Sequence, residues 1–139
     1  MTAHTPLEQA LEAWNRNLAH LQRGEDALPG SGYTRQQRVD DAVALGETGV
    51  FSNSNIGLIV GLDVALVGSL TGKTDRSGGR FNPQALPVIY DLWISWARGR
   101  TFDVITVRTA VNAGVSPRMI EKLTTIPKST LYKKLGEAS

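Results

Sequence analysis

The sequence predicts an all-α fold in which tandem trihelical units follow an N-terminal amphipathic helix. Apolar residues recur at helical spacing in segments that open with Ser, Thr or Asp, the residues that cap helix N-termini. Residues 49–73 and 114–137 resemble each other, which indicates an internal repeat. The chain has 139 residues and is 41% hydrophobic, sufficient for the core of one domain or of two very small ones.

The first element is a helix over "TPLEQALEAWNRNLAHLQRG", which with the following linker makes up residues 1–30. Thr5 suits its N-cap and Pro6 its first turn, and Gly24 follows its end. Large apolar residues repeat along it at the spacing of coiled-coil a and d positions: Leu7, Leu11, Trp14, Leu18 and Leu21. This stripe has two interpretations: it packs on its own domain, or it is a dimerisation surface.

Two further segments contain the trihelical units. In residues 33–82, helix starts are predicted at Thr34, where Gln37 completes a capping box, near Ser52 or Ser54, and near Asp63. In residues 83–139, a connecting helix covers "NPQALPVIYDLWISWARG", and further helices are predicted to open at Thr101, Ser116 and Pro127.

The stretch "GSLTGKTDRSGG", residues 68–79, contains a Gly-Lys-Thr but lacks the spacing of a phosphate-binding P-loop. Such a loop has a glycine five positions before the Gly of Gly-Lys-Thr, and Val67 occupies that position. The loop also lacks the preceding strand and the following helix that the motif requires. A nucleotide-dependent enzyme is therefore not expected, and no catalytic residue is assigned.

The two copies of the repeat each predict a short helix, a tight turn and a second helix. When Ile56 is aligned with Ile120, apolar positions coincide: Ile59 with Leu123, Leu62 with Ile126, and Val67 with Leu131. In the first copy Gly57 suits a close approach of the helices, and Gly61 suits a turn with positive φ. The second copy departs from this pattern, because Glu121 and Thr125 occupy the corresponding positions.

The string "IPKSTLYKKL" in the second copy resembles the recognition-helix segment of helix-turn-helix DNA-binding proteins of the Fis, resolvase and tetracycline-repressor types. The resemblance covers about the last 35 residues, and residues 49–73 show a weaker resemblance to the same segment. It implies tandem helix-turn-helix units whose final helix lies in a groove of double-stranded DNA. The alternative is an ordinary basic surface helix.

The resemblance also implies roles for individual residues. The candidates for contact with base edges are Ser129, Thr130 and Lys133. The candidates for contact with the DNA backbone are Lys128, Tyr132 and Lys134 on the last helix, and Arg118 and Lys122 on the helix before it.

The second helix of the first copy, "DVALVGSLTGK", has few groups that can read DNA. Its apolar side chains can touch thymine methyl groups but cannot hydrogen-bond to bases. We consider two interpretations: this helix packs against another segment or a second subunit, or the unit contacts DNA through basic residues that follow the helix. Those residues are Lys73, Arg76 and Arg80.

The distribution of charge favours a polyanionic partner. Residues 1–50 carry four Arg and seven acids, a net −3, whereas residues 101–139 carry six basic residues and three acids, a net +3. There is no cysteine, and the two histidines lie near the N-terminus without an acidic cluster. No metal site, disulfide or cofactor is therefore expected.

These observations predict a sequence-specific, double-stranded DNA-binding protein that regulates transcription, acts as a homodimer and resides in the cytoplasm. The absence of a ligand domain favours a regulator of a mobile element. No signal segment opens the chain, and its most apolar stretch, residues 56–70, is too short for a bilayer. The alternative is an adaptor or antirepressor that holds protein partners through the apolar second helix of the first copy.

Overall fold

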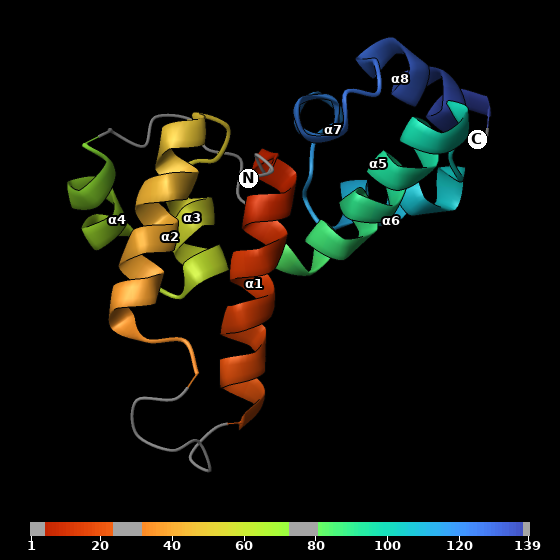
Figure 1. The fold of residues 1–139 in the computed structure, drawn as a ribbon. Coiled ribbons are helices and arrows are strands. Elements are labelled where there is room, and N and C mark those ends of the chain that lie inside the picture. Colours follow the sequence, from red (N-terminus) through yellow and green to blue (C-terminus); the bar gives the residue numbers. More distant parts are fainter. Residues whose placement is uncertain (1–4, 24–31, 73–80, 138–139) are drawn as a thin grey trace. The chain divides into compact units, whose positions relative to one another are not determined.

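The computed structural model describes residues 5–23, 32–72 and 81–137, and all regular secondary structure in them is helical (Figure 1). The all-α prediction is therefore confirmed. Contacts divide the chain into two compact units, Met1–Gly78 and Gly79–Ser139.

The first unit consists of four helices in the described residues: α1 (Pro6–Arg23), α2 (Arg35–Thr48), α3 (Asn53–Val60) and α4 (Val64–Thr71). Helix α1 packs against α2 and α3, and α4 packs against the same two helices. The long N-terminal helix therefore belongs to the core of this unit.

The second unit opens with a 3₁₀ turn, η2 (Pro83–Ala85), and continues with α5 (Leu86–Gly99), α6 (Val104–Asn112), α7 (Pro117–Thr124) and α8 (Lys128–Glu137). Helix α5 packs against α6 and α7, and α8 packs against the same two. In both units, the first and the fourth helix thus pack against the same two helices. The two units differ in one respect, because α2 also packs against α3 whereas α6 and α7 make few or no contacts.

Capping residues fix the helix starts. Thr5 and Glu8 form a reciprocal capping box at α1, and Thr34 with Gln37 forms another at α2, as the sequence predicts. The predicted start at Thr101 is wrong, because α6 begins after Asp103, whose carboxylate accepts a hydrogen bond from the Ile105 N–H at 2.9 Å.

The predicted apolar pairs form most of the core beneath the repeat. Ile56, Ile59 and Val67 are buried in the first unit, as are Ile120, Leu123 and Leu131 in the second. Leu62 is only half-buried, whereas its counterpart Ile126 is fully buried.

Most residues of the apolar stripe of α1 are buried or half-buried within the first unit. Leu7 and Trp14 are buried, and Leu11 and Leu18 are half-buried. Leu21, at the C-terminal end of the stripe, is 61% exposed. Packing of α1 on α2 and α3 accounts for the stripe up to Leu18, so a second subunit has little of it left to contact.

Among the described helices, none alone has both the length and the apolar content of a membrane span. The pair α3 and α4 reaches both together, but the chain bends by 113° between them.

Candidate nucleic-acid interface

The helix pairs α3–α4 and α7–α8 share one local geometry. Ser52 and Ser116 cap the first helices, and their hydroxyls accept hydrogen bonds from the N–H groups of Asn55 and Met119. Each first helix is eight residues long and ends at a residue with left-handed backbone, φ 78° at Gly61 and φ 67° at Thr125. Three residues then join the two helices in each pair.

Gly57 is the point of closest approach between α3 and the turn that follows it. A Cβ atom at this position would lie 2.7 Å from the carbonyl oxygen of Leu62. The prediction of a small residue here is therefore confirmed. Gly61 is constrained twice, because its φ is positive and its missing Cβ leaves space for the Arg38 guanidinium.

The α7–α8 turn achieves the same bend with different residues. Thr125 adopts the left-handed conformation without being glycine, at some cost in backbone strain. Thr124, fully buried, donates its hydroxyl to the Ile120 carbonyl at 2.7 Å and accepts the Ile126 N–H at 3.2 Å. These bonds hold the turn, so the departure from glycine does not disrupt it.

Glu121, the second departure from the repeat, lies where α7 meets the start of α8. Its Oε2 atom accepts a hydrogen bond from the backbone N–H of Lys128 at 2.7 Å. Lys128 is the first residue of α8, so its N–H group belongs to the first turn and has no acceptor within the helix. Glu121 therefore caps α8 from the preceding helix.

Helix α8 presents a polar stripe to solvent. Its exposed residues follow the i, i+3, i+4, i+7 spacing of one helix face: Ser129, Tyr132, Lys133 and Gly136. Leu131 is fully buried on the other side. Thr130, Lys128 and Lys134 are half-buried along the edges of the stripe. Tyr132, expected at the DNA backbone, thus shares the central stripe with Ser129 and Lys133.

Two of the cations expected at the DNA backbone, Arg118 and Lys122 on α7, are exposed, and so is Lys133 on α8, which is expected at base edges. Within the described part of the chain, no ion pair joins any of these three, or Lys128 and Lys134, to an acidic side chain. Residues 79–139 contain nine basic and four acidic residues, a net +5. The second unit therefore carries a net positive charge.

Helix α4 presents a different stripe at the corresponding positions. Ala65, Gly68, Ser69 and Gly72 stand where α8 has Ser129, Tyr132, Lys133 and Gly136. Only Val67 of α4 is buried, and Val64 is 44% exposed. The helix carries no charge, and Asp63 caps it through the Ala65 N–H at 3.0 Å. The basic residues after it, Lys73, Arg76 and Arg80, lie outside the described residues.

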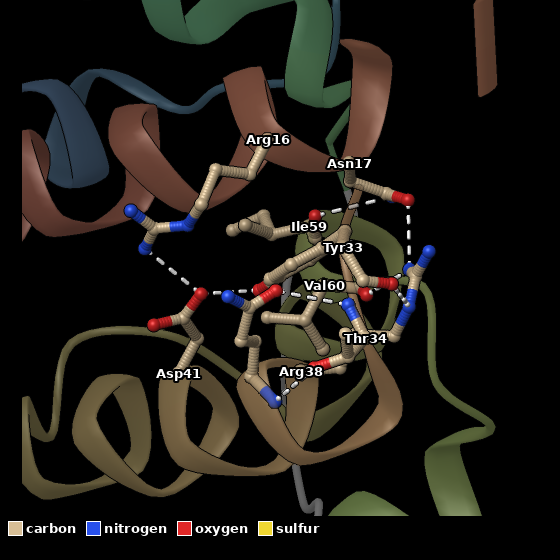
Figure 2. A network of polar contacts seen from close by, with 9 residues as sticks. Arg16, Asn17, Tyr33, Thr34, Arg38, Asp41, Ile59 and Val60 are labelled. Atoms are coloured by element: carbon tan, nitrogen blue, oxygen red, sulfur yellow. Dashed lines mark hydrogen bonds and ion pairs between the residues drawn. The ribbon is translucent and has the colours of Figure 1, made fainter. Parts of the chain in front are cut away.

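A polar network that sequence reasoning missed holds the end of α3 (Figure 2). The Arg38 guanidinium donates to the Val60 carbonyl at 2.6 Å and to the Asn17 side chain at 2.8 Å. The Arg38 Nε atom donates to the Tyr33 carbonyl at 3.2 Å, and the Arg38 Cζ atom lies 4.5 Å from the centroid of the Tyr33 ring. The network joins three helices through residues about 20 or more positions apart, so no local sequence pattern predicts it.

Tyr33 also belongs to a second polar cluster, which makes a pH-dependent prediction. Its hydroxyl donates to Asp41, which also accepts a hydrogen bond from Arg16 at 2.9 Å. Burial of Tyr33 raises the pKa of its hydroxyl, and the hydrogen bond to Asp41 and the charge of that carboxylate raise it further, against the opposing effect of Arg16.

The raised pKa means that the folded chain binds the hydroxyl proton of Tyr33 more tightly than the unfolded chain does. Its contribution to the free energy of unfolding is therefore complete at any pH where Tyr33 of the unfolded chain is still protonated. Above about pH 10 the unfolded chain loses this proton before the folded chain does, so the free energy of unfolding falls. Tyr33→Phe lacks this contribution. We expect the variant to be less stable than the wild type from pH 7 to 9, with the difference shrinking above about pH 10. Urea unfolding at each pH measures this difference, and a gap independent of pH would contradict the assignment.

The chain matches no family model, no curated protein and no solved structure. Among the described residues, no three His, Cys, Asp or Glu side chains lie together in a way that could hold a metal ion.

Proposed function

We propose that this chain is a sequence-specific, double-stranded DNA-binding protein that regulates transcription, with α7 and α8 as a helix-turn-helix pair and α8 as its recognition helix. The outward stripe of α8 is the main support. It sets hydroxyl, phenol and ammonium groups on one face opposite the buried Leu131, with no ion pair to a described acid. The turn between α7 and α8 has the short length typical of such pairs.

The chemistry of this stripe suits a major groove. Ser129 and Lys133 offer donors to base edges, since Ser pairs with several bases and Lys with the O6 and N7 atoms of guanine. Lys128 and Lys134 at the edges, with Arg118 and Lys122 on α7, suit phosphates on either side of the groove. Tyr132 offers a phenol to a phosphate or an aromatic face to a thymine methyl group.

The first unit is proposed to have a different task. Residues 1–78 contain six basic and nine acidic residues, a net −3, and the outward stripe of α4 is small and uncharged. Such a surface can form few favourable contacts with a DNA duplex, which is a polyanion. We propose that the chain acts as a homodimer through a surface other than the buried part of the α1 stripe, so that two copies of α8 reach half-sites about 34 Å apart, one turn of DNA.

Titration of the full chain with a labelled mixed-sequence duplex over a range of salt concentrations tests the proposal. The logarithm of the binding constant should fall linearly with the logarithm of salt concentration, by about 0.9 for each phosphate contacted. Selection of bound sequences from a random duplex pool should then enrich a two-fold symmetric site. No retention of duplex at low salt would reject the proposal.

The exposed, uncharged helix α4 supports a second candidate, an adaptor or antirepressor that holds protein partners. Val64 on this helix is 44% exposed and Leu66 and Leu70 are half-buried, so apolar side chains of α4 remain for a protein partner to cover. Chemical crosslinking alongside the duplex titration separates the two functions. Crosslinked partner complexes without any duplex retention at low salt would favour the adaptor.

A further inference from the structure

We propose that the outward face of α5 is the homodimer interface of this protein, where α5 packs against the antiparallel α5 of a second copy. This outward face consists of Pro87, Tyr90, Asp91, Ile94, Ala97 and Arg98. The inference rests on the proposed function, which has two copies of α8 on one duplex, and it names the surface that joins them.

Helix α5 buries only one of its sides within its own unit. Leu86, Ile89 and Leu92 recur at intervals of three residues and are no more than 1% exposed. The helix packs against α6 and α7. Because an α-helix has 3.6 residues per turn, the residues of the outward face lie on the opposite side. None of these six residues is buried, and four of them are exposed.

The middle of the outward face is apolar. Tyr90, Ile94 and Ala97 follow the alternating spacing of four and three that lines the seam between two packed helices. The ring of Tyr90 rests edge-on against that of Trp93, with 5.6 Å between the ring centroids, so its position is set before any partner binds. The small side chain of Ala97 lets a second helix come close.

One edge of the outward face carries two opposite charges, Asp91 and Arg98. Both are exposed, and neither makes an ion pair or a hydrogen bond with any described residue. Side chains on one helix pair at a spacing of three or four positions, whereas these two are seven apart, so they do not neutralise each other within one chain.

This charge pattern is complementary to itself in an antiparallel pair. When a two-fold axis passes between positions 94 and 95, Asp91 lies opposite Arg98 of the partner subunit. The symmetry then creates the same contact a second time, with the roles of the two chains exchanged. Self-complementarity of this kind favours a second copy of the chain as the occupant of the outward face.

The length of α5 indicates how strong such a dimer is. Its 14 residues extend over about 21 Å, so one helix pair buries less surface than a standard stable interface. The free chain should therefore dimerise weakly. A duplex with two half-sites strengthens the dimer, because binding of the first α8 raises the local concentration of the second.

The test reverses the two charges in the full chain and measures self-association by sedimentation equilibrium without DNA. Asp91→Arg sets two arginines opposite each other and Arg98→Asp two aspartates, so each should raise the dimer dissociation constant by about tenfold or more. An equimolar mixture of the two variants should associate as the wild type does, because their heterodimer has opposite charges at both contacts. The double variant Asp91→Arg with Arg98→Asp should also recover.

Arg35→Asp on α2 provides the matched control. It makes the same change in net charge as Arg98→Asp at another exposed position and should leave the dimer dissociation constant unchanged. Circular dichroism establishes that each variant is folded. Recovery in the mixture and in the double variant supports the inference, because neither a loss of folding nor a change in net charge produces both.

Three results would overturn the inference: a wild type that stays monomeric up to about 1 mM, equal weakening by Arg35→Asp, or no recovery in the mixture. Duplex titration of the wild type is read separately. Retention of duplex by a monomer would reject the α5 interface and leave DNA binding standing. Dimers that dissociate on charge reversal but retain no duplex would reject DNA binding and leave the α5 interface standing.

Discussion

Replacing Arg38 with alanine should lower the free energy of unfolding of the first unit by about 1–3 kcal/mol, the range for leaving hydrogen-bond acceptors without their donor. Arg38 donates three hydrogen bonds, all of them partly buried. Asn17 is only 3% exposed, so the lost bond leaves its side-chain oxygen without this donor. The Val60 carbonyl at the end of α3 loses its donor as well.

The same substitution at a neighbouring arginine provides the control. Arg35 lies on α2 like Arg38, but it is exposed and makes no hydrogen bond or ion pair with any described residue. Arg35→Ala removes the same charge and should change stability by less than about 0.5 kcal/mol. Arg38→Lys should fall between the two, because an ammonium group cannot reproduce the planar fork that reaches all three acceptors.

Urea unfolding followed by far-UV circular dichroism measures these differences. A loss below about 1 kcal/mol for Arg38→Ala would show that water replaces the guanidinium without penalty. The network would then be a surface feature, and the end of α3 would depend on apolar packing alone.

Local chemistry explains why the helices could be predicted from sequence. The N-caps at Thr34, Ser52 and Ser116 each act on an N–H three residues away, so the sequence alone identifies them. Gly57 and Gly61 were similarly recognisable, because a turn with positive φ and a close approach both favour glycine. Asp103 was missed because Thr101 is an equally suitable capping residue, and only the burial of Phe102 outside the helix decides between them.

Contacts between distant residues could not be predicted. The spacing of Leu7 and Trp14 shows that α1 has an apolar face, but not that α2 and α3 cover it. Arg38 reaches Asn17 and Val60, which lie more than 20 positions away on either side. Glu121 looked like a defect in the repeat, because its role depends on the path of the turn and on the proline that replaces an N-cap.

For α8, the sequence predicts which residues lie on the buried and exposed faces better than it predicts the burial of residues between those faces. Periodicity placed Leu131 inside and Lys133 outside, as observed. It could not show that Thr130 is half-buried or that Tyr132 stands at the centre of the stripe, because these depend on how α8 rests on α6 and α7.

Removing two lysines from α8 should weaken duplex binding by about 30- to 150-fold, because each lost phosphate or base contact is worth about 1–1.5 kcal/mol. Lys133→Ala with Lys134→Ala is suitable, since alanine favours helix and neither lysine has an ion pair among the described residues. The salt dependence should fall as well, by about 0.9 in the slope for each lysine that contacts a phosphate.

A second pair of substitutions decides whether this loss belongs to α8 or to net charge. Arg35→Ala with Arg100→Ala also removes two positive charges from exposed positions outside α8. Non-specific attraction by the whole chain would lower affinity equally in both double variants. Contact through the α8 stripe would lower it only in the lysine variant, since long-range attraction is screened over about 10 Å at 0.1 M salt. Equal losses in the two variants would therefore remove α8 from the interface, even if the protein binds DNA.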